Sequence, residues 1–200
     1  MPEFQTEKLL DQLAEDTRKL VEVVQQEFRP LTNDALNQQP GPARWSVAQC
    51  LAHLNSYGQY YLPALEMAFA DENRRQIPAS PRFRSSWFGN YFANSMRPKT
   101  DGSIGLKMKA VQAHRPADVL PSETVLRMFL EQQQALLDLL EQARQVNIQQ
   151  LTVPISIARW LRLSVGDTFR FLIAHQQRHV LQAQRVVAAL NLQPVIAVQS

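Results

Sequence analysis

The sequence contains very little cysteine and glycine, which excludes several classes of protein. Of its 200 residues, one is cysteine and six are glycine. A single cysteine forms no intramolecular disulfide and cannot build a four-thiolate zinc module, so a reducing compartment fits best. The sequence also has no glycine-rich phosphate-binding loop and no nucleophile elbow. Disulfide-rich secreted scaffolds and the common nucleotide-binding folds are therefore excluded.

Long apolar runs are also missing. None approaches the roughly 20 residues of a membrane span, and the first ten residues, MPEFQTEKLL, lack the apolar core of a signal peptide. We therefore expect a cytoplasmic protein that makes no membrane contact. A hydrophobic content of 45% is enough for one packed core, so we expect a single domain over residues 1–200.

The net charge of +3 is small but unevenly distributed. Residues 71–116 contain nine Lys or Arg against three Asp or Glu, which leaves the rest of the chain at −3. This segment mixes cations with aromatic residues, as single-stranded nucleic-acid platforms do, but a lid or a plain soluble cover has the same composition. We expect nucleic-acid binding here to be weak, nonspecific and sensitive to salt. The residues concerned are Arg74, Arg75, Arg82, Phe83, Arg84, Trp87, Phe88, Tyr91 and Phe92.

Apolar residues recur at helical spacing in four stretches, and no comparable stretch alternates with period two. This pattern predicts an all-α fold, a four-helix bundle with a long crossover between the second and third helices. Short helical turns are expected at 87–96 within the crossover, and a loop through Pro154 is expected between the last two helices. The expected helices cover about residues 7–28, 45–70, 122–146 and 164–190, and the crossover covers 71–121.

Local signals mark where two of these helices begin. Ser46 and Gln49 have the spacing of a capping box, in which each side chain bonds the backbone amide of the other residue. Ser164 is followed three residues later by Asp167, whose carboxylate complements the dipole at a helix N-terminus.

Three histidines are predicted to face the interior of the bundle. His175 and His179 are four residues apart and share one helix face, which could bind a metal. The same helical arithmetic turns His53 inward on the second helix. An alternative is that these histidines are only hydrogen-bonded or half-exposed. His114 lies in the basic crossover, and we expect it to be exposed and uninvolved.

Other candidate residues lie on the same helix faces. Cys50 is expected to be a small buried hydrophobe rather than a reactive thiol. Tyr57 and Tyr61 could bring hydroxyl groups near the histidines or belong to the core. Gln182 lies one turn beyond His179, in position to contact a ligand or a ligating group. We expect Tyr57 and Gln182 to be the substrate-binding residues.

One motif extends from the second to the fourth expected helix. It consists of Trp45-Ser46, then Ala52-His53-Leu54, a long crossover, Phe171-Leu172-Ile173-Ala174-His175-Gln176-Gln177-Arg178-His179 and finally Gln182. This motif resembles that of the DinB superfamily. The resemblance covers most of the chain. It implies a four-helix bundle, often a homodimer, with a divalent metal held by His53, His175 and His179. Characterised members of the family include transferases and isomerases that use low-molecular-weight thiols such as bacillithiol or mycothiol.

Three hypotheses for the function follow. The first is a metal-dependent thiol S-transferase or hydrolase whose catalytic residues are unknown; the fourth helix has no HExxH motif and so no zincin-type general base. The second is a non-catalytic, stress-related bundle that binds a metal or ligand, and the third is a nucleic-acid binder acting through the crossover. Three neutral imidazoles suit zinc, nickel, iron or copper, and among these we expect zinc or nickel.

We also expect a homodimer, for two reasons. The resemblance implies one, and leucines near the edges of the apolar stripes would leave apolar surface uncovered. These leucines include Leu9, Leu139 and Leu151.

Overall fold

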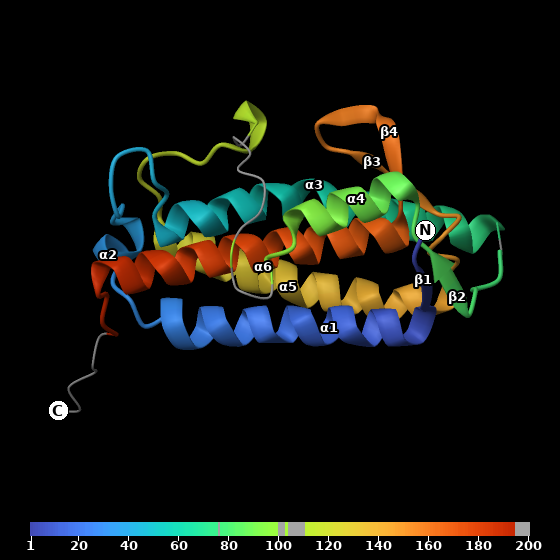
Figure 1. The fold of residues 1–200 in the computed structure, drawn as a ribbon, viewed down its shortest axis with the longest axis horizontal. Coiled ribbons are helices and arrows are strands. Elements are labelled where there is room, and N and C mark those ends of the chain that lie inside the picture. Colours follow the sequence, from blue (N-terminus) through green and yellow to red (C-terminus); the bar gives the residue numbers. More distant parts are fainter. Residues whose placement is uncertain (76, 100–102, 104–110, 195–200) are drawn as a thin grey trace.

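The computed structural model describes residues 1–75, 77–99, 103 and 111–194, and it is predominantly helical (Figure 1). Four long helices run side by side along the long axis of the molecule, which confirms the predicted four-helix bundle. The first, α1, continues directly into a π-helical turn, η1. These elements are α1 (Thr6–Val23), η1 (Val24–Phe28), α3 (Val47–Arg75), α5 (Ser122–Gln142) and α6 (Val165–Leu190).

Each long helix packs mainly against two of the other three. The principal contacts join α3 to α5 and α6, and α1 to the same two helices. In this arrangement α3 and α6 are neighbours, although 89 residues separate the end of one from the start of the other. Any residue on the inward face of α3 therefore lies close to the inward face of α6.

The core between these helices is aliphatic and aromatic. Its largest fully buried side chains include Phe28, Tyr61, Phe129 and Phe169. Leu139 and Leu151, which were expected to leave apolar surface at the stripe edges, are 2% and 4% exposed and belong to this core. They therefore contribute nothing to a dimer surface. Leu9 is half-buried and packs against the same core, so the homodimer stays a prediction that rests on the resemblance.

The crossover begins later than the sequence predicts, because α3 continues to Arg75. It contains β2 (Arg82–Arg84), the expected helix α4 (Trp87–Met96) and a 3-10 turn, η2 (Gln112–His114). Strand β2 pairs antiparallel with β1 (Glu3–Gln5), and α4 packs against α6. A short helix, α2 (Asn33–Asn37), precedes α3.

A buried polar cluster fixes the crossover to the start of α6. The carboxylate of Asp167 accepts hydrogen bonds from the Ser85 hydroxyl, from the backbone N–H of Ser86 at 3.0 Å and from Nη1 of Arg170 at 3.1 Å. Arg170 also donates from Nη2 to Oδ1 of Asn90 on α4, at 2.9 Å. Asp167 and Arg170 are 0% and 3% exposed, so this end of the bundle is held by a shielded ion pair.

The expected loop through Pro154 is instead a β-hairpin of β3 (Thr152–Ile155) and β4 (Ala158–Ser164). The strands pair antiparallel, with Val153 opposite Leu163 and both side chains buried. The prediction was wrong because these strands are short and the alternation of buried and half-buried residues covers only four positions in β3. The hairpin leads directly into α6, which begins at the predicted position. Its N-cap Ser164 accepts from the backbone N–H of Asp167.

Within the described residues, no helix combines the length and the apolar character needed to cross a membrane.

Candidate metal centre

The start of α3 is fixed by the predicted capping box. The backbone N–H of Ser46 donates to Oε1 of Gln49 at 3.0 Å, and the N–H of Gln49 donates to the Ser46 hydroxyl at 3.2 Å. His53 follows about two turns later, on the face that meets α6. The rotation of α3 that brings this imidazole inward is therefore set by a local signal at the helix N-terminus.

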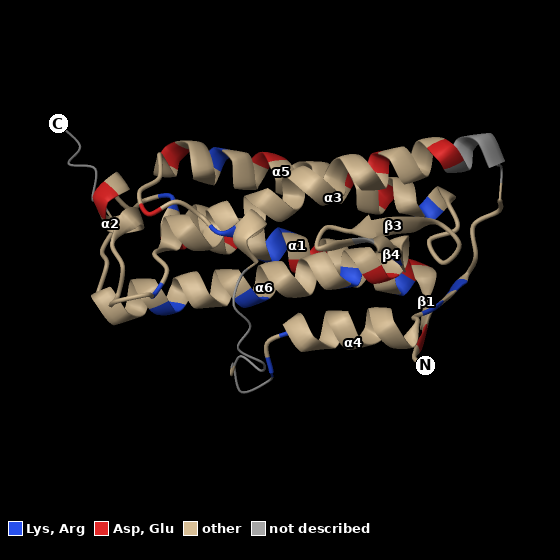
Figure 2. Ribbon diagram, turned by 90° about the horizontal axis from the view of Figure 1, so that it is seen from above, with Lys and Arg blue, Asp and Glu red and all other residues tan. Residues whose placement is uncertain are grey.

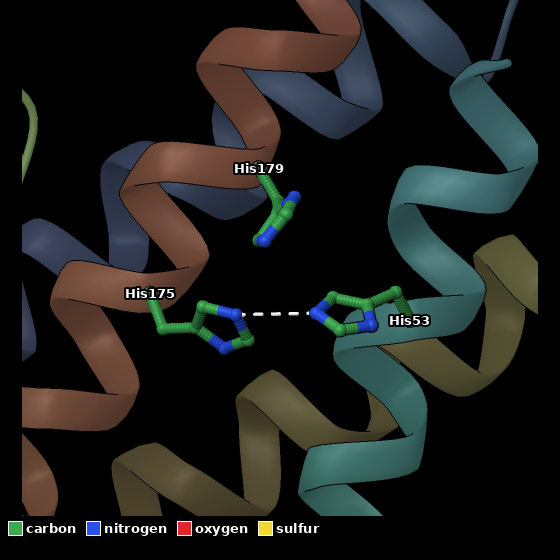
Figure 3. Close-up of side chains that lie close together, drawn as sticks. All are labelled: His53, His175 and His179. Carbon is green, nitrogen blue, oxygen red and sulfur yellow. Dashed lines mark hydrogen bonds between the residues drawn. The ribbon is translucent and has the colours of Figure 1, made fainter. Parts of the chain in front are cut away.

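The structure brings His53, His175 and His179 together between α3 and α6 (Figure 3). Their ring centroids are separated by 4.6 to 5.0 Å, and one nitrogen of each ring lies within 4.8 Å of the nitrogens of the other two. The Nε2 atoms of His53 and His175 are 3.2 Å apart. All three side chains are buried, with exposures of 3%, 4% and 9%.

Hydrogen bonds orient two of the three rings. Nδ1 of His53 donates to the backbone carbonyl of His114 at 2.7 Å, and Nδ1 of His179 donates to Oε1 of Gln182 at 3.1 Å. Because Nδ1 carries the proton in both neutral rings, each Nε2 keeps a lone pair free. In metal-binding histidines, a hydrogen bond from the ring nitrogen that does not bind the metal usually fixes the tautomer.

Aromatic side chains pack around the histidines. Trp45 lies 4.9 Å from the ring of His53 and 5.7 Å from that of His179. Phe171 stacks on His175 at 5.7 Å with an interplanar angle of 8°, and Tyr57 lies 4.5 Å from the same ring. These contacts restrict rotation of the imidazoles and shield them from bulk water.

Burial keeps the three imidazoles neutral. Desolvation is the main cause that lowers the pKa of His53 to about 4 and the pKa of His179 to about 3, and it also lowers the pKa of His175 well below its ordinary value. In His175 and His179 the neighbouring histidines lower the pKa further, because a second positive charge nearby is unfavourable. All three rings are thus neutral near pH 7, the charge state that metal ligation requires.

The geometry fits a divalent cation. Two metal–nitrogen bonds of about 2.1 Å that meet at a tetrahedral angle place their nitrogens about 3.4 Å apart, and the His53–His175 separation of 3.2 Å is close to this value. Three imidazole ligands are also the donor set of catalytic zinc sites, which leave a fourth position for water or substrate. All three imidazoles therefore have the charge state of metal ligands, and the His53–His175 pair also has the spacing.

The expectation that His114 is exposed and uninvolved was wrong. Its side chain is 8% exposed, and its ring lies 4.0 Å from that of Tyr57. Hydroxyl groups bond both of its ring nitrogens, that of Ser56 at 2.9 Å and that of Ser156 at 3.2 Å. These contacts hold the backbone carbonyl that orients His53. No periodicity marks this part of the crossover, so the sequence pattern offers no signal for it.

The remaining candidate residues lie as follows. Tyr57 packs between His114 and His175, and Gln182 bonds His179. Cys50 is fully buried, and burial raises the pKa of its thiol, in agreement with its interpretation as a small hydrophobe. Tyr61 is in the core, and its hydroxyl accepts from the backbone N–H of Ser156 at 3.1 Å. The contact of Trp45 with two of the histidines was not predicted.

Four of the described cations of the crossover form two groups at opposite ends of α4, and Arg115 lies apart from both, after η2. Arg82 and Arg84 precede the helix and pair with Glu3, at 2.6 and 3.9 Å, whereas Arg97 and Lys99 follow it. Figure 2 shows the ten residues of α4 uncharged between these groups, a length of about 15 Å. Lys107 and Lys109 lie outside the described residues. Nucleic-acid binding through the crossover stays a hypothesis from the sequence.

Comparisons with known proteins agree with this architecture. The family model of the DinB superfamily matches residues 9–183. Among solved structures, the chain is similar to YfiT from Bacillus subtilis, which is described as a probable metal-dependent hydrolase with an unusual four-helix bundle topology. The two chains are 14% identical, the match covers 94% of this chain and 89% of YfiT, and the TM-score is 0.54. The search of curated proteins gives no match.

Proposed function

The chain belongs to the DinB superfamily, and we propose that it is a metal-dependent hydrolase in which His53, His175 and His179 hold a divalent cation. The observation that carries the proposal is the convergence of three buried, neutral imidazoles from two helices on one point. The description of YfiT as a probable metal-dependent hydrolase supports the choice of reaction. Zinc or nickel is the proposed cation, because neutral imidazoles suit both.

The donor set determines what chemistry is available. A divalent cation held only by neutral imidazoles keeps its full charge and supplies the Lewis acidity that lowers the pKa of a water molecule or thiol towards 7. The His53–His175–His179 cluster contains no carboxylate, so it offers no acidic side chain as a general base. His53 and His179 are held with their Nε2 lone pairs free by His114 and Gln182.

We propose that Tyr57 and Gln182 contact the substrate. Desolvation raises the pKa of Tyr57 to about 12, so its hydroxyl stays protonated and can donate a hydrogen bond to an anionic or carbonyl oxygen. Gln182 bonds His179, one of the residues that would hold the cation, so it lies beside the centre. We place the enzyme in the cytoplasm on the sequence arguments given above, and as a homodimer on the family resemblance.

Transfer to or from a low-molecular-weight thiol is the second candidate. The three neutral imidazoles favour it too, because they leave the charge of a bound divalent cation unneutralised. Such a cation stabilises a thiolate as it stabilises hydroxide. Hydrolysis needs no second organic substrate, whereas thiol transfer requires one. The two reactions are therefore separated by whether turnover depends on added thiol.

The test uses protein purified without a histidine tag, stripped with a chelator and reloaded with zinc or nickel. The reloaded enzyme should hydrolyse members of an ester and amide panel without thiol, and the stripped enzyme should not. His175→Ala should abolish turnover. Gln177→Ala, which changes a half-buried residue of the same helix, should leave it intact. Turnover that is unaffected by chelation and by His175→Ala would refute the proposal, and strict dependence on thiol would favour the second candidate.

A further inference from the structure

We infer that a single buried water molecule, held by the side-chain amide of Gln176, is the hydrogen-bond partner of Nδ1 of His175 and lets this ring change tautomer when a cation binds. The inference rests on the proposed function, because it concerns how His175 becomes a ligand. It assigns Gln176 as a positioning residue that acts on the centre through His175.

The first step is the unequal treatment of the three histidines. Nδ1 of His53 donates to the backbone carbonyl of His114, and Nδ1 of His179 donates to the side-chain oxygen of Gln182. Nδ1 of His175 is buried and has no partner among the described residues. Figure 3 shows the ring nitrogen of His175 that does not contact His53 directed away from His179. A buried ring nitrogen without a partner costs about 1–3 kcal/mol, so a partner is expected there.

The second step is the space beside His175. A small cavity is lined by His175, Gln176 and Gln132, together with apolar residues of α3, α5 and α6. The space open to the centre of a water molecule is about 10 Å³, and one water requires about 10–15 Å³ by this measure. Oε1 of Gln176 is also buried without a partner in the described part of the chain. The cavity is thus large enough for one water, and two of the residues that line it each have a buried polar atom without a described partner.

The wall opposite His175 is also polar. Nε2 of Gln132 donates to the backbone carbonyl of Asn55 at 3.1 Å, which fixes the amide and leaves its Oε1 as an acceptor. This oxygen lies only 2.1 Å from the point where a Cβ on Gly58 would be. The absence of a Cβ at position 58 lets the Gln132 amide lie this close to α3, and Gln132 also lines the cavity.

The third step is the proton on His175. Nδ1 of His53 donates to a carbonyl, so Nε2 of neutral His53 can only accept, and the 3.2 Å contact requires a proton on Nε2 of His175. Ligation needs that Nε2 unprotonated, with the proton on Nδ1 instead. A carbonyl could serve only the second tautomer, but water donates to a bare Nδ1 and accepts from a protonated one. The cavity water is the partner that suits both.

Two measurements test this. In ¹⁵N-histidine spectra, the His175 proton should lie on Nε2 in zinc-free protein and on Nδ1 in zinc-loaded protein. In a high-resolution crystal structure, one water should lie within hydrogen-bond distance of both His175 Nδ1 and the Gln176 side chain. A dry cavity, or a direct bond from Gln176 to His175, would overturn the inference.

Substitution provides the matched comparison. Gln176→Leu should weaken zinc binding about 10–100-fold, the usual cost of losing a partner of a ligating histidine. Gln133→Leu removes another buried glutamine whose Oε1 lacks a described partner but which does not line the cavity, and it should leave affinity unchanged. If folded Gln176→Leu bound zinc as tightly as the wild type, the role of Gln176 would be refuted and the proposed function would not be. Absence of zinc binding by the wild type would instead refute the proposed function, while the cavity water would still be visible in crystals.

Discussion

The Nε2 atoms of His53 and His175 lie 3.2 Å apart, although 122 positions separate the two residues in the chain. This contact joins α3 to α6 at the level where His179 also turns inward. Two neutral, buried imidazoles share one hydrogen bond here, and ligation of both would require the proton of His175 to move from Nε2 to Nδ1. The three predictions that concern the histidines follow from this relationship.

Gln182→Leu should reduce zinc affinity about 10–100-fold. Its Oε1 is the acceptor for Nδ1 of His179, and leucine cannot hold the proton on that nitrogen. Competition with a fluorescent zinc indicator measures the change. Gln184→Leu is the control, because Gln184 lies two residues away on α6 and bonds Glu27 rather than a histidine. Identical affinities in both variants would show that Gln182 does not orient the ligand.

The helix starts and the paired histidines were predictable because they depend on local spacing. Ser46 and Gln49 lie three residues apart and His175 and His179 four apart, so backbone geometry alone places each pair. His53 required one further step, the assumption that the second and fourth helices are neighbours in a bundle. The contacts between α3 and α6 confirm that assumption.

Stability of the zinc-free protein should fall as the pH drops below about 6.5. Above this value the histidines are neutral in both folded and unfolded states. Below it the unfolded chain takes up protons at the ordinary histidine pKa of 6.5, whereas the folded pKa is about 4 for His53 and about 3 for His179. The unfolded state then binds more protons, so each such histidine costs about 1.4 kcal/mol per pH unit.

Urea unfolding between pH 7.5 and 5 measures this dependence. The histidine contribution should level off towards pH 7.5, one unit above the ordinary histidine pKa. His179→Leu removes one of the histidines that only the unfolded state protonates. The slope of the unfolding free energy against pH should therefore fall by up to about 1.4 kcal/mol per pH unit between pH 6.5 and 5. A slope that is the same in wild type and variant would contradict the burial of His179 as a neutral ring.

Asp167→Ala should destabilise the protein by about 3–5 kcal/mol, because it leaves the buried guanidinium of Arg170 without its counter-ion. Chemical denaturation measures the loss. Glu131→Ala removes a partner from the exposed pair with Arg127 and should cost no more than about 0.5 kcal/mol. Similar losses in the two variants would mean that the Asp167–Arg170 pair is not shielded.

Gly166→Ala should cost about 1–3 kcal/mol through overpacking. A Cβ at this position would lie 2.6 to 2.9 Å from three ring atoms of Phe83, which is itself fully buried. Gly41→Ala is the control, since its nearest neighbour would be the Arg44 side chain at 3.6 Å, and it should be neutral or slightly stabilising. Thermal unfolding of both variants distinguishes the two sites, and equal melting temperatures would contradict the close approach of β2 to α6.

The features that the sequence did not predict depend on contacts between distant segments. His114 belongs to an irregular stretch and is buried by Tyr57, Ser56 and Ser156, which come from α3 and from the turn of the β3–β4 hairpin. That hairpin is itself stabilised by pairing across a two-residue turn rather than by a long alternating pattern. Burial of Leu139 and Leu151 likewise follows from tertiary packing, which helical periodicity does not determine.

Anomalous diffraction from crystals of the untagged protein soaked in zinc tests the central claim most directly. The account predicts one strong peak about 2.1 Å from a nitrogen of each of His53, His175 and His179, and loss of that peak in His179→Ala crystals with the helices unchanged. Crystals in which these three imidazoles stay metal-free while zinc binds elsewhere, or not at all, would contradict it.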